Sequence, residues 1–228
     1  PQGLDDQALY AVDQYLMRGG TLFVAAGNYK INVDPYGGGL GLQPIEGGLQ
    51  DMLTSYGVTV DPSVVLDTQN LPFPMQVTRN VGGFQVQQVE ALNYPFFVDV
   101  RPGGMQRGST MTSQLNSLML AWASPVTVDA EKNSARKVTT LLSSSDQSWA
   151  STDTNIQPNV DLFPETGFPV GTDQKAYPLA VVIEGSFDSY FKGKASPLDA
   201  AENTDTADQE MPLAAEEVQP RKPGLGNI

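Results

Sequence analysis

The clearest hydrophobic pattern of the chain lies near its start. Apolar side chains recur there at i, i+3 and i+7, which places them on one face of a helix: Leu9, Val12 and Leu16. Asp5 or Asp6 can cap this helix, because a short carboxylate accepts hydrogen bonds from the unpaired N–H groups of the first turn. Gly19 can adopt the left-handed conformation that ends many helices. The pattern therefore predicts an amphipathic helix that ends at Gly19.

An apolar run, Thr21–Ala26, follows this helix without polar alternation. A strand that is apolar on both faces is usually central and parallel, with helices on both sides. The same order then recurs, because an apolar stripe over residues 49–56 predicts a second helix and Val58–Val60 and Val64–Leu66 have strand patterns. Tyr177–Glu184 is the second strongest strand pattern of the chain.

This alternation predicts an α/β fold, a three-layer sandwich around a mixed sheet that is parallel at its start, as in a doubly wound domain. No strand precedes the first helix and few helices follow the second, so we expect only part of a larger domain. We assign residues 1–194 to this α/β domain. Residues 195–228 are acidic and poor in apolar side chains, which is typical of a disordered spacer.

A glycine-rich connection, Gly27–Gly48, leaves the end of the predicted central strand. In open α/β sheets, ligands and partners usually bind at the carboxyl ends of the strands. The connection lacks the Gly-Lys-Ser/Thr ending of a phosphate loop, and no G-x-G-x-x-G motif occurs in the chain. We therefore expect a surface loop that contacts a partner protein, with Asn28 and Tyr29 at its base.

Composition excludes several classes of function. The chain has 228 residues and a formal net charge of -13, which argues against nucleic acid or anionic lipid as the main partner. It contains neither histidine nor cysteine, so Cys–His and Ser–His catalysis and zinc sites built on these ligands are excluded. No apolar run is long enough to span a bilayer, which takes about 20 residues. We expect no cofactor, no metal site and no direct membrane insertion.

The remaining candidate groups favour structure over chemistry. Ser143–Ser145 follow a predicted strand and are interpreted as turn formers. The acidic residues are spread among turns and strand ends and lack a calcium-loop pattern, although two distant carboxylates could still form a glycosidase pair. Most aromatic residues are expected in the core. Trp149 is the exception we consider, because an exposed tryptophan can stack on a sugar or anchor a partner protein.

Several stretches together resemble one family, the GldG-type auxiliary components of ABC transport systems, which are named for gliding motility. The similarity runs in order over residues 1–194. The stretches are QYLMRGG (14–20), LTSYGVTVDPSVVLD (53–67), NYPFFVDV (93–100), LLSSSDQSW (141–149) and YPLAVVIEGSFDSYF (177–191). The family's extracytoplasmic domain is also distantly similar to class I glutamine amidotransferase domains. The resemblance thus implies a flavodoxin-like or amidotransferase-like fold on the periplasmic side of the bacterial inner membrane, in a membrane-anchored parent protein.

The resemblance also implies a function. The chain is expected to be a non-enzymatic scaffolding domain of an export or gliding-motility system. It would act through contacts with the permease and ATPase subunits of that system, with Asn28, Tyr29 and Trp149 as candidate contact residues. One alternative is a carbohydrate-binding or carbohydrate-active module that uses surface carboxylates and an exposed aromatic. Another is a purely structural domain whose relatives lost an ancestral active site.

Overall fold

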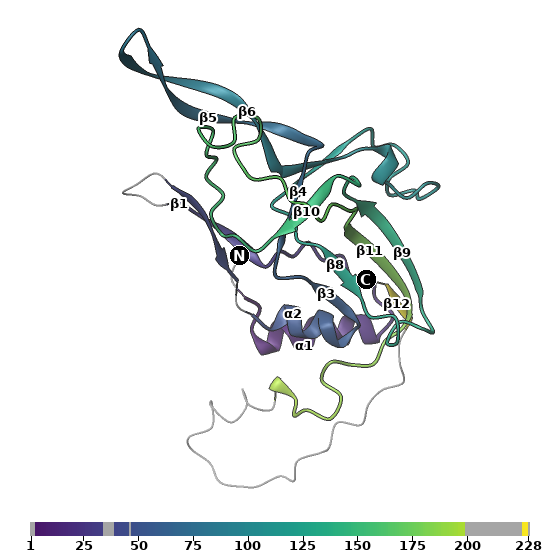
Figure 1. The fold of residues 1–228 in the computed structure, drawn as a ribbon. Helices are drawn as coiled ribbons and strands as arrows, with labels where there is room; N and C mark the ends of the chain where they lie inside the picture. Colours follow the sequence, from purple (N-terminus) through teal and green to yellow (C-terminus); the bar gives the residue numbers. More distant parts are fainter. Residues whose placement is uncertain (1–2, 34–38, 46, 199–224, 228) are drawn as a thin grey trace, which may run out of the picture.

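The computed structural model describes residues 3–33, 39–45, 47–198 and 225–227 and shows a strand-rich molecule (Figure 1). The described elements are two α-helices, one 3₁₀ helix and twelve strands. They are α1 (Asp6–Met17), β1 (Tyr29–Val33), β2 (Leu40–Pro44), α2 (Gly48–Ser55), β3 (Val58–Val60), β4 (Val64–Asp67), β5 (Asn70–Val81), β6 (Phe84–Val100), η1 (Pro102–Gly104), β7 (Leu118–Ala121), β8 (Val126–Val128), β9 (Lys137–Ser143), β10 (Ser148–Ser151), β11 (Pro178–Ser186) and β12 (Leu225–Asn227).

The first helix forms as predicted. Asp5 is its N-cap, and its side-chain oxygen accepts a hydrogen bond from the backbone N–H of Ala8 at 2.8 Å. Gly19 follows the helix with a φ of 87°, the left-handed conformation expected there. Leu9 and Leu16 are buried among side chains from α2, β3 and β11. The helix therefore covers a core, as its apolar stripe indicates.

The predicted three-layer α/β sandwich is wrong. Every strand pair found among the described residues is antiparallel, and the strands form five small sheets: β1–β2, β4–β10, β3–β8, β5–β6–β7 and β9–β11–β12. Parallel sheets need helices on both faces, and the two α-helices of the described chain cannot supply those layers. The predicted strands β3, β4 and β11 do exist. Each of them pairs in antiparallel orientation with a strand from a later or earlier part of the chain, β8, β10 and β9 respectively.

The predicted central strand, Thr21–Ala26, belongs to none of the named strands. Its side chains alternate in exposure, and Phe23 is 90% exposed, whereas Leu22 packs against the cluster around α1. An apolar run shows that a segment can be buried, but a strand also needs a ladder partner. The apolar pattern could not reveal that Thr21 alone of this run forms a β-bridge within the described part of the chain.

The glycine-rich connection also differs from the expected loop. Much of it forms an antiparallel hairpin, β1–β2, while residues 34–38 lie outside the described part. Leu42 of β2 is buried in the aromatic core, and its N–H donates to the carbonyl of Thr154 at 2.8 Å. Ile156 in turn donates its N–H to the carbonyl of Leu40. The hairpin is therefore fixed to the body of the protein along one strand.

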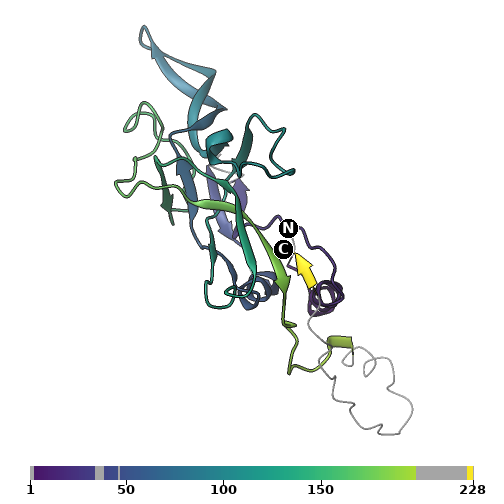
Figure 2. The same ribbon diagram turned by 90° about the vertical axis from the view of Figure 1, so that its right-hand side faces the viewer.

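A long two-stranded arm extends from the body in both views of the molecule (Figures 1 and 2). The arm comprises residues 70–92, which are β5, the Gly82–Gly83 turn and the first part of β6, and at its base Phe73 packs against the core. The remainder of β6 is buried in the body, where Tyr94, Phe96 and Phe97 join the aromatic core. The buried part of β6 is therefore continuous with its projecting part.

A buried carboxylate connects α1 to two other segments. Asp13 is fully buried and accepts hydrogen bonds from the Tyr56 hydroxyl at 2.6 Å, the Ser189 hydroxyl at 2.7 Å and the Tyr190 N–H at 2.7 Å. Burial and this carboxylate together raise the pKa of Tyr56 above its usual value. Asp13 thus holds α1, the end of α2 and the segment after β11 together.

The acidic segment 195–228 falls mostly outside the described part of the chain, which excludes residues 199–224 and 228. Residues 225–227 form β12, which pairs with the end of β11 next to α1. The division into 1–194 and 195–228 stays a prediction. None of the helices that the structure describes is both long and apolar enough to cross a membrane.

Candidate functional site

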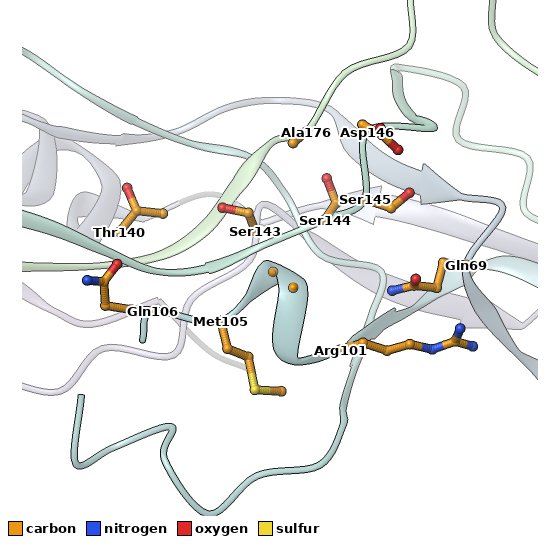
Figure 3. A pocket seen from close by; sticks show the side chains of 12 residues that line it. Gln69, Arg101, Met105, Gln106, Thr140, Ser143, Ser144, Ser145, Asp146 and Ala176 are labelled. Carbon is orange, nitrogen blue, oxygen red and sulfur yellow. The ribbon is translucent and has the colours of Figure 1, made fainter. Parts of the chain in front are cut away.

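A polar cavity of about 640 Å³ opens between η1 and the turn that joins β9 to β10 (Figure 3). In this view, Thr140 and Gln106 lie at one end of the cavity and Gln69 and Arg101 at the other. Its lining consists of hydroxyl, amide and backbone groups with one cation and one carboxylate: Gln69, Arg101, Gly103, Gly104, Met105, Gln106, Thr140, Ser143, Ser144, Ser145, Asp146 and Ala176. We take this cavity as the candidate site.

The turn on one side of the cavity is held by a buried carboxylate. Asp67, at the end of β4, accepts hydrogen bonds from the Ser145 N–H at 2.7 Å and the Ser145 hydroxyl at 2.6 Å. It also accepts the Gln69 N–H at 2.8 Å. Asp67 is fully buried, so these donors compensate the loss of its hydration. One side chain therefore fixes two parts of the cavity wall.

A second set of hydrogen bonds fixes the neighbouring serine. The hydroxyls of Ser144 and Ser148 lie 2.6 Å apart, and Ser144 also accepts the N–H of Tyr177 at 2.8 Å. Ser148 donates toward the carbonyls of Ser145 and Lys175 at 2.8 and 2.7 Å. Ser144 and Ser148 are both buried. The predicted role of Ser143–Ser145 as turn formers agrees with this arrangement, because the hydroxyls of Ser144 and Ser145 bond to the protein itself.

The other side of the cavity depends on a close backbone approach. A Cβ atom at Gly104 would lie 2.3 Å from the carbonyl oxygen of Ser143, so only glycine fits without a shift of the backbone. Next to it, Met105 forms a bridge with Leu142, and the Gln106 N–H donates to the Leu141 carbonyl at 2.8 Å. The turn η1 is therefore fixed against the end of β9.

Arg101 supplies the positive charge of the cavity. Its Nε donates to Asp99 Oδ2 at 2.8 Å, and its side chain is 57% exposed. The Gln69 side chain donates to the carbonyl of Asp99, so both lining residues are oriented by the same neighbour. Asp99 Oδ1 is buried and has no hydrogen-bond partner among the described atoms. The guanidinium N–H groups that Asp99 leaves free can bind oxygen atoms of a ligand.

The polar groups of this lining are suited to binding a ligand. Ser144 and Ser145 already make hydrogen bonds within the protein, and the chain has no histidine to act as their base. Within the described residues, no group of three or more Asp or Glu side chains could hold a metal ion. The arrangement can bind a polar ligand through Arg101, the amides of Gln69 and Gln106 and the exposed edge of the serine turn.

The structure places two of the predicted contact residues against the turn between β3 and β4. The Asn28 side-chain amide donates to the carbonyls of Val60 and Asp61, both at 2.7 Å. The Tyr29 hydroxyl donates to the carbonyl of Pro62 at 3.0 Å. Both side chains therefore brace the base of the β1–β2 hairpin. Their contact with a partner protein stays a prediction.

Trp149 lies in β10 and is only 5% exposed. It belongs to the aromatic core, where its indole lies so close to Gly171 that a Cβ there would reach within 2.5 Å of the ring. The structure does not bring Trp149 together with Asn28 and Tyr29 in one site. Its proposed role in partner contact also stays a prediction.

Sequence reasoning missed most of the cavity lining. Gln69 precedes β5, whereas Arg101 and Gln106 flank η1, and these two segments meet through antiparallel pairing that local patterns did not show. One available signal was the sequence RPGG at residues 101–104, because a proline followed by two glycines marks a tight turn that can approach another backbone closely.

Comparison with known proteins identifies the family. The family model described as an ABC-type uncharacterized transport system matches residues 1–218. None of the curated proteins and none of the solved structures gives a match. Because the family model covers most of the chain, the protein belongs to the family of auxiliary components of ABC-type transport systems.

Proposed function

We propose that this chain is a non-enzymatic scaffolding domain of a GldG-type auxiliary component in an ABC-type export or gliding-motility system. It acts on the periplasmic side of the inner membrane, as part of a membrane-anchored protein, by contact with the permease and ATPase-bearing assembly. The observation that carries the proposal is the family match over residues 1–218.

Two structural features support a role in binding rather than catalysis. The hydroxyls of Ser144 and Ser145 are engaged in the fold, and the chain has no histidine to activate them. The β1–β2 hairpin, in contrast, is braced by Asn28 and Tyr29, which hold its base against the turn between β3 and β4. A braced hairpin beside a folded body is a suitable element for contact with another protein.

Co-purification with the other subunits of the same transport system tests this proposal. A variant in which residues 34–39 are replaced by Asn-Gly shortens the hairpin and retains both the braced base and the buried Leu42. We expect an unchanged melting temperature and a severalfold loss of co-purified permease. Val170→Ser, a change at an exposed position of the 152–176 connection, is the matched control and should retain the permease. Full retention by the shortened hairpin would remove it from the interface, and failure of the unaltered chain to retain any subunit would contradict the proposal itself.

The alternative function is carbohydrate binding, and the polar cavity is the observation that favours it. Arg101, Gln69 and Gln106 offer the charged and amide groups that bind sugar hydroxyls or a carboxylate. Its lining has no aromatic ring on which a sugar could stack, and Trp149 lies in the core. Calorimetric titration with neutral and acidic oligosaccharides distinguishes the two functions. Binding that Arg101→Ala abolishes would support the carbohydrate alternative.

A further inference from the structure

The β5–β6 arm differs in charge from the rest of the chain. The chain has a formal net charge of -13, but residues 70–92 contain one arginine and one glutamate as their only charged residues. An isolated two-stranded ribbon is marginally stable in water at best. A ribbon without net charge that projects from an acidic body therefore calls for a partner that covers it (Figure 1).

The two outer edges of the arm are not equivalent. In an antiparallel pair, successive residues direct their N–H and C=O groups alternately toward the partner strand and away from it. Proline has no N–H to give to a ladder, so Pro72 and Pro74 occupy outward positions of β5. Pairing places Ala91 opposite Pro74 and Val89 opposite Gln76, so these β6 residues are also directed outward. The prolines thus protect the β5 edge, whereas β6 has a complete set of donors and acceptors.

The open β6 edge runs over residues 85–91. Its outward positions are Gln85, Gln87, Val89 and Ala91, and all four residues are exposed. No other strand of the described part of the chain pairs with this edge, because β7 pairs only with residues 97–100. Natural proteins usually protect a long exposed edge with charges, prolines or bulges, because it can pair with another chain.

One face of the arm tip is apolar. Val81 pairs with Phe84, and Val86 follows two positions later, so the three side chains lie on the same face. They are 60%, 77% and 44% exposed, respectively. Leu92 also lies an even number of residues from Phe84 and shares this face at the base of the arm, with the polar pair Gln88 and Glu90 between it and the apolar tip. The arm thus combines an open edge with an exposed apolar face.

We propose that the arm pairs with the arm of a second copy of this chain, β6 against β6 and antiparallel, to form a four-stranded sheet. A twofold axis at Gln88 brings the outward residues of both edges into register and sets Phe84 of one copy opposite Leu92 of the other. Each exposed tip then packs near the base of its neighbour, and the apolar tips of both copies lie on the same side of the sheet, on either side of the central Gln88 and Glu90 side chains.

Charge favours a second copy over a different protein. Two acidic bodies repel each other, and the arm is the part that can meet its own copy without charge repulsion. A basic partner would instead gain most from contact with the acidic body. The arm projects from the body (Figure 2), so antiparallel pairing of two arms places the two bodies at opposite ends of the four-stranded sheet.

Sedimentation velocity of the 228-residue chain over a wide range of concentration tests this pairing. Gln87→Pro removes an outward N–H from the β6 edge, and Val89→Lys adds a charge there, a change that spares the intramolecular ladder. Gln76→Pro and Thr78→Lys make the same changes at outward positions of β5 and are the matched controls. We expect a dimer that both β6 variants weaken at least tenfold and that both controls retain. Equal weakening by variants and controls, or a monomer at every concentration, would overturn the proposal.

A cysteine cross-link tests the register independently of stability. The chain contains no cysteine, so Gln88→Cys introduces a single thiol. At the twofold axis, the two thiols lie at directly opposed positions that pairing brings close enough for a disulfide. We expect rapid disulfide dimers for Gln88→Cys under mild oxidation and none for Thr78→Cys. Equal cross-linking of both variants contradicts the pairing, as does an arm that binds phosphatidylcholine vesicles or a transport subunit while the chain stays monomeric.

Discussion

The buried Asp13 carboxylate offers the sharpest test of how this fold is held together. It joins α1 to the Tyr56 hydroxyl at the end of α2 and to the Ser189 hydroxyl and Tyr190 N–H after β11. Asp13→Ala removes these three acceptor contacts at once, together with the one from the neighbouring Gln14 side chain at 3.1 Å, and alanine preserves the helix because it has the best helix propensity. The substitution therefore isolates the contribution of the carboxylate.

The expected loss follows from the environment of each donor. A hydrogen bond to a charged group contributes about 1.5–3 kcal/mol, and an unsatisfied buried donor costs about 1–3 kcal/mol. The Tyr56 ring is fully buried, so its hydroxyl has no access to water, whereas Ser189 and Tyr190 are half-buried and can be rehydrated. Removal of the carboxylate also relieves its own desolvation cost. We expect the free energy of unfolding to fall by about 2–4 kcal/mol, which is a large share of the 5–15 kcal/mol that is usual for a folded domain.

Urea denaturation followed by circular dichroism measures this loss. With an m-value of about 2 kcal/mol/M, the midpoint should fall by about 1–2 M. Tyr56→Phe is the matched variant, and Asp13→Ala combined with Tyr56→Phe should lose less than the sum of the single changes, because no hydroxyl is then left unpaired. A midpoint within about 0.3 M of the unaltered chain, or strictly additive losses, would refute this account of the carboxylate.

Three further predictions concern the core and the cavity wall. Leu16→Asp places an unpaired carboxylate in the core beneath α1 and should abolish cooperative folding, so a melting curve like that of the unaltered chain would contradict burial of this face. Asp67→Ala should lower the free energy of unfolding by about 2–3 kcal/mol and increase amide hydrogen exchange at residues 143–146. Unchanged exchange would show that the serine turn does not need this acceptor. Burial raises the pKa of Tyr94 to about 12, although the weak hydrogen bond from Trp122 lowers it. The protonated hydroxyl is therefore favoured by the fold, and its stabilising effect is complete below about pH 10 and lost as the pH rises through about 12. Tyr94→Phe should flatten the fall in urea midpoint over this range, and an equally steep fall would contradict the assignment.

Local elements could be predicted from the sequence where the signal was itself local. The stripe of Leu9 and Leu16, the Asp5 cap and the left-handed Gly19 involve residues within a few positions of each other, and the structure confirms the first helix. The strands β3, β4 and β11 were recognised for the same reason. Apolar pattern and turn chemistry were sufficient for these elements.

Strand partners could not be predicted, and this produced the wrong fold class. An apolar run such as Thr21–Ala26 has the same pattern whether it is central in a parallel sheet or lies outside every named strand. The candidate cavity depends on the same information, because Asp67 meets Ser145 only through the pairing of β4 with β10. Neither the hydrophobic periodicity nor the composition of the sequence predicts that pairing.

The long-range ladders also determine how the chain can fold. Leu66 of β4 pairs with Trp149 of β10, and 149 minus 66 separates them by 83 positions. At a synthesis rate of about 5–20 residues per second, β4 leaves the ribosome roughly 4–17 s before its partner. Folding dominated by such distant pairings is slow, typically milliseconds to seconds even for a complete chain. The apolar strand β4 therefore spends this interval without its ladder, a period in which chaperone binding competes with aggregation.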